Sequence, residues 1–257
     1  MRQYVVDAFT DKVFRGNQAA VCVMEVWPDE QLMKAIAREN NFSETAFTVR
    51  EGDTWRLRWF TPTIEIDLCG HATLATAYAL FRFHEPDAEE IVFRTMSGEL
   101  RVARRDAWLV MDFPAYRLNP IPVTDEMEAA LGARPREAYL DRDLLLVYDD
   151  ESAVRNMKPD IALVANLPGM AACPTAPGSD FDCVSRFFAP DMGIDEDPVT
   201  GSAHCMVAPY WAQRLGKSEI HAWQASERGG ELLCTVSGER VSVAGKAALY
   251  SVCDLHV

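Results

Sequence analysis

The segment IDLCGHATLATA, residues 66–77, brings a thiol, a glycine and an imidazole side by side. The small residues after them predict a buried helix over 70–81 that begins at Gly70. The N-terminus of a helix carries unpaired N–H groups and a partial positive charge, so it binds carboxylates and phosphates. His71 is expected to be neutral there and to donate a hydrogen bond to a substrate or pass a proton, unless it only packs between two domains.

A second segment of this kind is DEDPVTGSAH, residues 195–204, which opens another small-residue helix. Its predicted start at Gly201 and Ser202 is a second candidate for anion binding. Asp197, just before that start, is expected to hold a substrate amine or hydroxyl. It belongs to a cluster of three acids that should raise one another's proton affinity. A solvated acidic turn with a threonine cap is the alternative.

Glu44 lies among apolar side chains in NFSETAF, residues 41–47. If it is buried, desolvation should raise its pKa towards neutrality, so that the carboxyl can take and return a proton. A capping acid and an exposed strand residue are the alternatives.

Cys69 is a further candidate, because a thiolate is stabilised near a helix N-terminus. The corresponding place in DEDPVTGSAH has no cysteine, so a two-thiol proton transfer lacks its partner. The other histidines show no HxH, HxxxH or HExxH spacing, and no phosphate-loop or dinucleotide motif occurs. Neither a metal ion nor an organic cofactor is therefore predicted.

The two halves of the chain resemble each other. RWFTPTIEIDLCGHATLATAYAL begins at Arg58, and RFFAPDMGIDEDPVTGSAHCMVAPYW begins at Arg186. Each contains an Arg, an aromatic residue, a Phe and a Pro, then an acidic loop and a small-residue helix. The repeat predicts two similar domains, 1–115 and 116–257, whose final strand can cross to the first domain. A small molecule is expected to bind in the cleft between them.

Composition limits the partners and the cellular location that the chain is expected to have. The chain has 257 residues and a net charge of 25 − 39 = −14, so its surface repels double-stranded nucleic acid. Its seven cysteines are an odd number without a CxxC motif, which favours a reducing compartment. No signal-peptide layout and no apolar run of roughly 20 residues is present, so a cytoplasmic protein without a membrane partner is predicted.

Several ordered motifs, including ARENNFSETAF, LRWFTPTIEIDLCGHATLATA and DEDPVTGSAH, resemble the phenazine-biosynthesis (PhzF-like) family, which shares its fold with diaminopimelate epimerase. The resemblance implies an α+β fold of two pseudo-symmetric domains, each a curved, mostly antiparallel sheet around a central helix. It also implies a homodimer and a cofactor-independent isomerase that moves a proton on a small carboxylate-bearing substrate. Glu44 matches the family's general acid/base. The residues that match its substrate-binding motifs are Gly70, His71, Asp197, Gly201 and Ser202.

Two other functions stay open at this stage. One is a catalytically retired member of the family that binds a small molecule or a protein. The other is an amino-acid racemase or epimerase that uses Cys69. The epimerase relatives use two cysteines, whereas only Cys69 is present here, so the resemblance favours the single-glutamate route.

Overall fold

The computed structural model describes residues 1–257, which divide into two compact units. Unit 1 consists of Met1–Asp112 and Ala244–Val257, and unit 2 consists of Phe113–Val243. The last strand belongs with unit 1 because β17 (Ala247–Asp254) pairs with β1 (Arg2–Ala8) in antiparallel register. No helix has both the length and the apolar character needed to cross a bilayer. All seven cysteines are free thiols.

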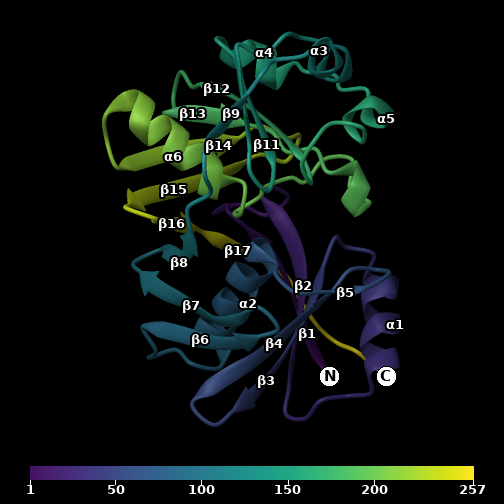
Figure 1. Cartoon of the computed structure of the whole chain (residues 1–257). Helices are drawn as coiled ribbons and strands as arrows, with labels where there is room; N and C mark the ends of the chain where they lie inside the picture. Colours follow the sequence, from purple (N-terminus) through teal and green to yellow (C-terminus); the bar gives the residue numbers. More distant parts are fainter. The chain divides into compact units, whose positions relative to one another are not determined.

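Unit 1 is a mostly antiparallel sheet with the strand order β17-β1-β2-β3-β4-β6-β7-β8 (Figure 1). Only the β2–β3 and β4–β6 pairs are parallel. The remaining elements of unit 1 are β2 (Asn17–Met24), α1 (Glu30–Asn40), β3 (Thr45–Glu51), β4 (Thr54–Phe60), β5 (Glu65–Ile66), α2 (Gly70–Phe83), β6 (Glu90–Thr95), β7 (Gly98–Arg105) and β8 (Trp108–Pro114), whose end passes into unit 2.

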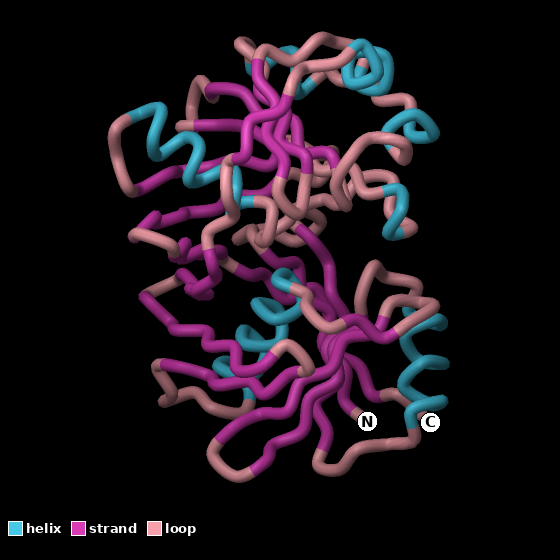
Figure 2. Tube along the Cα trace, in the orientation of Figure 1, coloured by secondary structure: helices cyan, strands magenta, loops and turns pink.

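Helix α2 is the central helix of unit 1. It contacts β1, β2, β3, β6 and β17, and Figure 2 shows the strands curving around it. Ten of its fourteen residues are buried, as its small side chains predict. The second helix, α1, packs against β3 through Met33 and Ile36, which join a cluster that includes Phe47 and Val49. Alternate residues of β3 therefore face α1, since successive strand side chains point to opposite faces.

Unit 2 is built in the same way around the order β9-β10-β11-β12-β13-β14-β15-β16. Its core lies between the sheet and the short helices that follow β9 and β11. The elements of unit 2 are β9 (Asn119–Ile121), α3 (Asp125–Leu131), β10 (Glu137–Leu140), β11 (Leu144–Val147), α4 (Glu151–Arg155), α5 (Ile161–Val164), β12 (Ala172–Pro177), β13 (Cys183–Ser185), a 3₁₀ turn (Pro190–Met192), α6 (His204–Leu215), β14 (Glu219–Gln224), β15 (Gly230–Ser237) and β16 (Arg240–Gly245), whose end passes into unit 1.

The strand pairings repeat between the units. In unit 1 the pairs β1–β2, β2–β3, β3–β4, β4–β6 and β6–β7 alternate between antiparallel and parallel. In unit 2 the pairs β10–β11, β11–β12, β12–β13, β13–β14 and β14–β15 follow the same alternation. In unit 1, helix α2 lies in the chain between β4 and β6, the second parallel pair. In unit 2, helix α6 lies between β13 and β14, which are again the second parallel pair. The topology therefore agrees with the duplication inferred from sequence.

Helix α6 begins later than the sequence pattern indicates. Gly201 to Ala203 form a turn with i→i+3 hydrogen bonds, and the α-helix starts at His204. Pro209 lies inside this helix and cannot donate a hydrogen bond to the carbonyl of Cys205. The backbone N–H of Tyr116 donates to that carbonyl instead, at 2.8 Å.

Candidate functional site

The fold brings Glu44 to the start of α2. Helix α1 is followed by its C-cap residue Asn41, which adopts the left-handed conformation, and Glu44 directly precedes β3. The Asn40 side chain fixes this connection by donating to Gln3 Oε1 and Thr45 Oγ1, at 2.9 and 3.1 Å. Strand β3 contacts α2, so the residue that enters β3 lies close to one end of the helix.

Glu44, Cys69 and His71 form one buried cluster in unit 1. The Cys69 Sγ lies 3.5 Å from His71 Nδ1, and His71 Nε2 lies 3.1 Å from Glu44 Oε2. All three residues are less than 9% exposed. The contact between Nε2 and Oε2 is close but is not aligned as a hydrogen bond, so neither of these buried atoms has an aligned partner. Such atoms are rare in folded proteins and are a reason to look for a ligand or a catalytic role.

The charge states of this cluster differ from the sequence-based expectation. Burial alone raises the pKa of Glu44, but the facing His71, with Ser43 and Cys69, lowers it below its ordinary value. Burial lowers the pKa of His71, yet Cys69 and Glu44 raise it well above its ordinary value. The expectations of a near-neutral glutamic acid and a neutral histidine are therefore wrong. The resting pair is a carboxylate and an imidazolium, because opposite charges in a buried site stabilise each other.

Cys69 rests as a neutral thiol. Its burial, followed by the charge of Glu44, raises the pKa of the thiol and outweighs the opposing effect of His71. The first turn of α2 therefore does not produce a reactive thiolate at this position, although a helix N-terminus favours one.

The same three residues are the one group of donor side chains close enough to be considered as a metal site. Thiolate, imidazole and carboxylate are all zinc ligands. However, the two ring nitrogens of His71 face different partners, Cys69 and Glu44, and a metal ion binds only one of them. The arrangement fits the sharing of protons better than the chelation of a metal.

The residues predicted in the second half also come together, within unit 2. Asp197 is 9% exposed and accepts a hydrogen bond from Thr200 Oγ1 at 2.5 Å. The fully buried Gln224 accepts from the Thr200 N–H at 2.8 Å and donates to the Asp197 carbonyl at 2.7 Å. Gly201 and Ser202 follow in the turn that leads into α6. Nothing in the sequence singled out Gln224, which lies at the end of β14 and closes this loop.

The three neighbouring acids of this loop do not act as one cluster. Asp195 is exposed, Glu196 forms an ion pair with Arg186, and Asp197 is buried beside Thr200. The predicted mutual effect on proton affinity therefore has no basis in their placement.

His204 is the histidine of the second segment, and it is neutral. Its Nδ1–H donates to the Thr200 carbonyl at 2.9 Å, and burial lowers its pKa to about 4. It has no carboxylate facing it, so desolvation decides its charge.

A bidentate ion pair precedes the functional helix in each unit. Arg58 Nε and Nη2 donate to Glu65 at 2.7 Å each, and its guanidinium lies 5.1 Å from the Phe60 ring centre. Arg186 Nε and Nη2 donate to Glu196 at 2.7 Å each, and its guanidinium lies 4.8 Å from the Phe188 ring centre. These are the Arg and Phe of the repeated sequence pattern. These two ion pairs, Arg58–Glu65 before α2 and Arg186–Glu196 before α6, are called the Arg–Glu clamps below.

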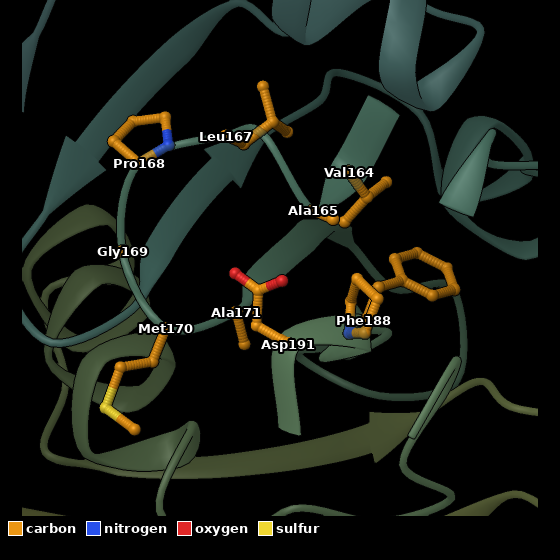
Figure 3. Close-up of a pocket in the computed structure, with 10 residues that line it drawn as sticks. Val164, Ala165, Leu167, Pro168, Gly169, Met170, Ala171, Phe188 and Asp191 are labelled. Atoms are coloured by element: carbon orange, nitrogen blue, oxygen red, sulfur yellow. The ribbon is translucent and has the colours of Figure 1, made fainter. Parts of the chain in front are cut away.

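A separate small hollow lies in unit 2 between the α5–β12 connection and the 3₁₀ turn (Figure 3). Val164, Phe188 and Asp191 are among its lining residues, and its volume of about 10 Å³ admits one water molecule. It contains none of the predicted site residues.

Comparison with known proteins places the chain in a family. The model of the phenazine biosynthesis-like proteins, PhzC-PhzF, matches residues 6–252. The chain belongs to the phenazine biosynthesis-like family. A Pseudomonas aeruginosa protein named as an uncharacterized isomerase is 53% identical over 245 residues, which cover 95% of this chain and 94% of the relative. Family membership and such relatives identify the chain as an enzyme of the isomerase class.

Solved structures agree with this assignment. A PhzF-family phenazine biosynthesis protein from Enterococcus faecalis matches with a TM-score of 0.98 and 47% identity, covering 100% of this chain and 99% of that one. The two-domain α+β fold predicted from sequence is therefore confirmed. A probable proline racemase from Agrobacterium radiobacter shares the fold alone, with a TM-score of 0.64 and 12% identity over 100% of this chain and 93% of that one.

Proposed function

We propose that this isomerase moves a proton between two carbons of a small carboxylate-bearing substrate, with Glu44 as the general acid/base and without a cofactor. The observation that carries the proposal is the buried Glu44–His71 pair, in which two facing polar atoms lie 3.1 Å apart without hydrogen-bond alignment. A group that titrates in a buried, coupled pair is a candidate for catalysis.

In this mechanism the Glu44 carboxylate removes a proton from a carbon next to an electron-withdrawing group. The electron pair of the broken C–H bond moves into the substrate. The same carboxyl then returns its proton to another carbon, so the substrate is isomerised without oxidation or reduction. The backbone N–H groups at the start of α2 and the His71 imidazolium can stabilise the negative charge that develops.

Unit 2 contributes binding in this proposal. Asp197, Gly201 and Ser202 match the family's substrate-binding motif, and Asp197 is held in a fixed position by its own hydrogen bonds. A carboxylate accepts hydrogen bonds from a substrate amine or hydroxyl. The cytoplasmic location and the homodimer remain predictions from sequence.

The racemase alternative is less favoured, because it requires a Cys69 thiolate. Burial and Glu44 raise the pKa of this thiol, whereas the Glu44 carboxylate is ionised and ready to accept a proton. A retired binding protein has no need of an ionised buried acid facing an imidazolium. One experiment distinguishes the proposed function from both the racemase and the retired binding protein.

That experiment is a screen of small ring-containing carboxylic acids and amino acids for uptake of deuterium from D₂O, read by NMR. We expect exchange at carbon with the wild-type enzyme, loss of exchange in Glu44→Gln and retained exchange in Cys69→Ser. Exchange that survives Glu44→Gln but not Cys69→Ser supports the thiol racemase instead. No exchange with any compound, together with tight binding of one of them, supports the retired binding protein.

A further inference from the structure

We propose that Cys69 is a positioning residue, whose sulfur holds the His71 ring in the orientation that presents Nε2–H to Glu44. The inference rests on the proposed function of Glu44 and His71, and it assigns the neutral thiol a part in the same reaction.

The position of Cys69 is fixed by the first turn of α2. It is the N-cap residue and has an extended backbone conformation, with φ −146° and ψ 112°. Its carbonyl accepts hydrogen bonds from both the N–H and the Oγ1 of Thr73, at 3.2 and 2.5 Å. The sulfur is therefore attached to a rigid part of the helix.

The thiol makes no side-chain capping hydrogen bond to the helix that it begins. Serine, threonine, aspartate and asparagine are the common N-cap residues, because their oxygens bind the free N–H groups of the first turn. A cysteine is a weak acceptor, and the backbone N–H of Ala72 in this turn has only a minor effect on the pKa of the thiol. The side chain is instead directed to His71 Nδ1 at 3.5 Å, which is within hydrogen-bond distance for sulfur.

Each ring nitrogen of His71 thus lies next to one partner, Cys69 or Glu44. With both nitrogens protonated, Nδ1–H faces the Cys69 sulfur and Nε2–H faces the Glu44 carboxylate. The thiol can donate its own proton to Glu44 in turn, which closes a three-membered network. A partner on one ring nitrogen determines the orientation and protonation of the other, as in catalytic triads.

The test follows the His71 ring directly in the free protein and needs no substrate. The protein is labelled with ¹⁵N-histidine, and the ring nitrogen shifts are measured between pH 5 and 9. Wild-type protein is expected to keep both nitrogens of His71 protonated at neutral pH. In Cys69→Ala the midpoint of the His71 titration should fall by about one pH unit, since one of its two stabilising partners is removed. Cys69→Ser should give an intermediate shift and serves if the alanine variant does not fold.

Cys22→Ala is the matched control, because Cys22 is also a fully buried thiol of unit 1 but is hydrogen-bonded to Gln3. It should lower the unfolding midpoint while the His71 titration is unchanged. The proposal is overturned if Cys69→Ala and Cys69→Ser titrate like the wild type, or if the wild-type ring is neutral at pH 7 with a bare Nε2. Either result leaves the deuterium-exchange test of Glu44 unaffected, so the two proposals fail separately.

Discussion

The two functional segments have the same scaffold but different chemistry. Each is associated with an Arg–Glu ion pair of 2.7 Å hydrogen bonds and leads into a largely buried helix, α2 or α6. In unit 1 the buried acid faces an imidazolium and keeps an oxygen without an aligned donor. In unit 2 the buried acid is hydrogen-bonded by Thr200, and the nearby His204 is neutral.

This difference suggests how a duplicated fold divides the work of catalysis. A segment with coupled charges can exchange a proton, because small movements change which group holds it. An acid that is hydrogen-bonded by its neighbours, as Asp197 is by Thr200, keeps one geometry and suits the binding of a substrate. In the proposed function, unit 1 therefore supplies the acid/base group and unit 2 a group that binds the substrate.

The largest expected effect separates proton transfer from binding. Glu44→Gln should lower the maximal rate of substrate deuterium exchange by about 10²- to 10⁴-fold, the usual contribution of a general acid/base. Asp197→Asn should mainly raise the substrate concentration needed for half-maximal exchange, because it weakens binding. Rates are measured at several substrate concentrations. If Asp197→Asn lowers the maximal rate as strongly as Glu44→Gln, the division of roles between the units is wrong.

The two buried histidines should give opposite pH dependences of stability. His204 has a folded pKa of about 4 and an unfolded value of 6.5, so the unfolded state binds more protons between these values and stability falls as pH drops through this window. The full effect is about 3 kcal/mol. His71 has a raised folded pKa, so its contribution is present below pH 6.5 and is lost as pH rises through the folded pKa.

Urea unfolding of the wild type, His204→Asn and His71→Asn across pH 4–9 checks this expectation. His204→Asn should flatten only the acid limb of the stability profile. His71→Asn should flatten the alkaline limb and also change the acid limb, because it removes the partner that keeps the pKa of Glu44 low. A flattening of the alkaline limb by His204→Asn, or an unchanged alkaline limb in His71→Asn, would contradict the comparison.

The two Arg–Glu clamps should contribute unequally to the free energy of unfolding. Arg186→Met is expected to cost about 2 to 3 kcal/mol of unfolding free energy, because Arg186 also donates to the Met157 carbonyl at 2.6 Å. Arg58→Met should cost less, since its additional partner is the half-exposed Glu30. Denaturant unfolding of both variants measures the difference, and equal losses would mean that the extra carbonyl contact is unimportant.

The smallest expected effect concerns the threonines of the two segments. Thr200→Val removes the hydroxyl that donates to Asp197 and should cost about 1 kcal/mol. Thr73→Val should cost less, because the Cys69 carbonyl still accepts the backbone N–H of residue 73. Thermal unfolding provides the measurement. A larger loss for Thr73→Val would show that the unit 1 segment, rather than the unit 2 segment, depends on hydroxyl hydrogen bonds.

Local pattern in the sequence determined much of this protein. The small residues after Gly70 predicted a buried helix over 70–81, and the structure has α2 at Gly70–Phe83. The repeated Arg, Phe and acidic loop predicted two similar halves, and the strand pairings repeat accordingly. These features depend on residues close in the chain, or on a repeat that can be read directly from it.

Tertiary structure alone decided the chemical state of the site. The apolar neighbours of Glu44 in the sequence left its burial open and predicted a raised pKa if it were buried, because desolvation was the one effect that the sequence indicates. The fold brings His71 to 3.1 Å from Glu44, and this charge reverses the direction of the shift. It likewise brings Gln224 to the Asp197 loop and moves the start of α6 to His204. Electrostatic energies vary with the distance and burial of groups far apart in the chain, and only folding sets these quantities.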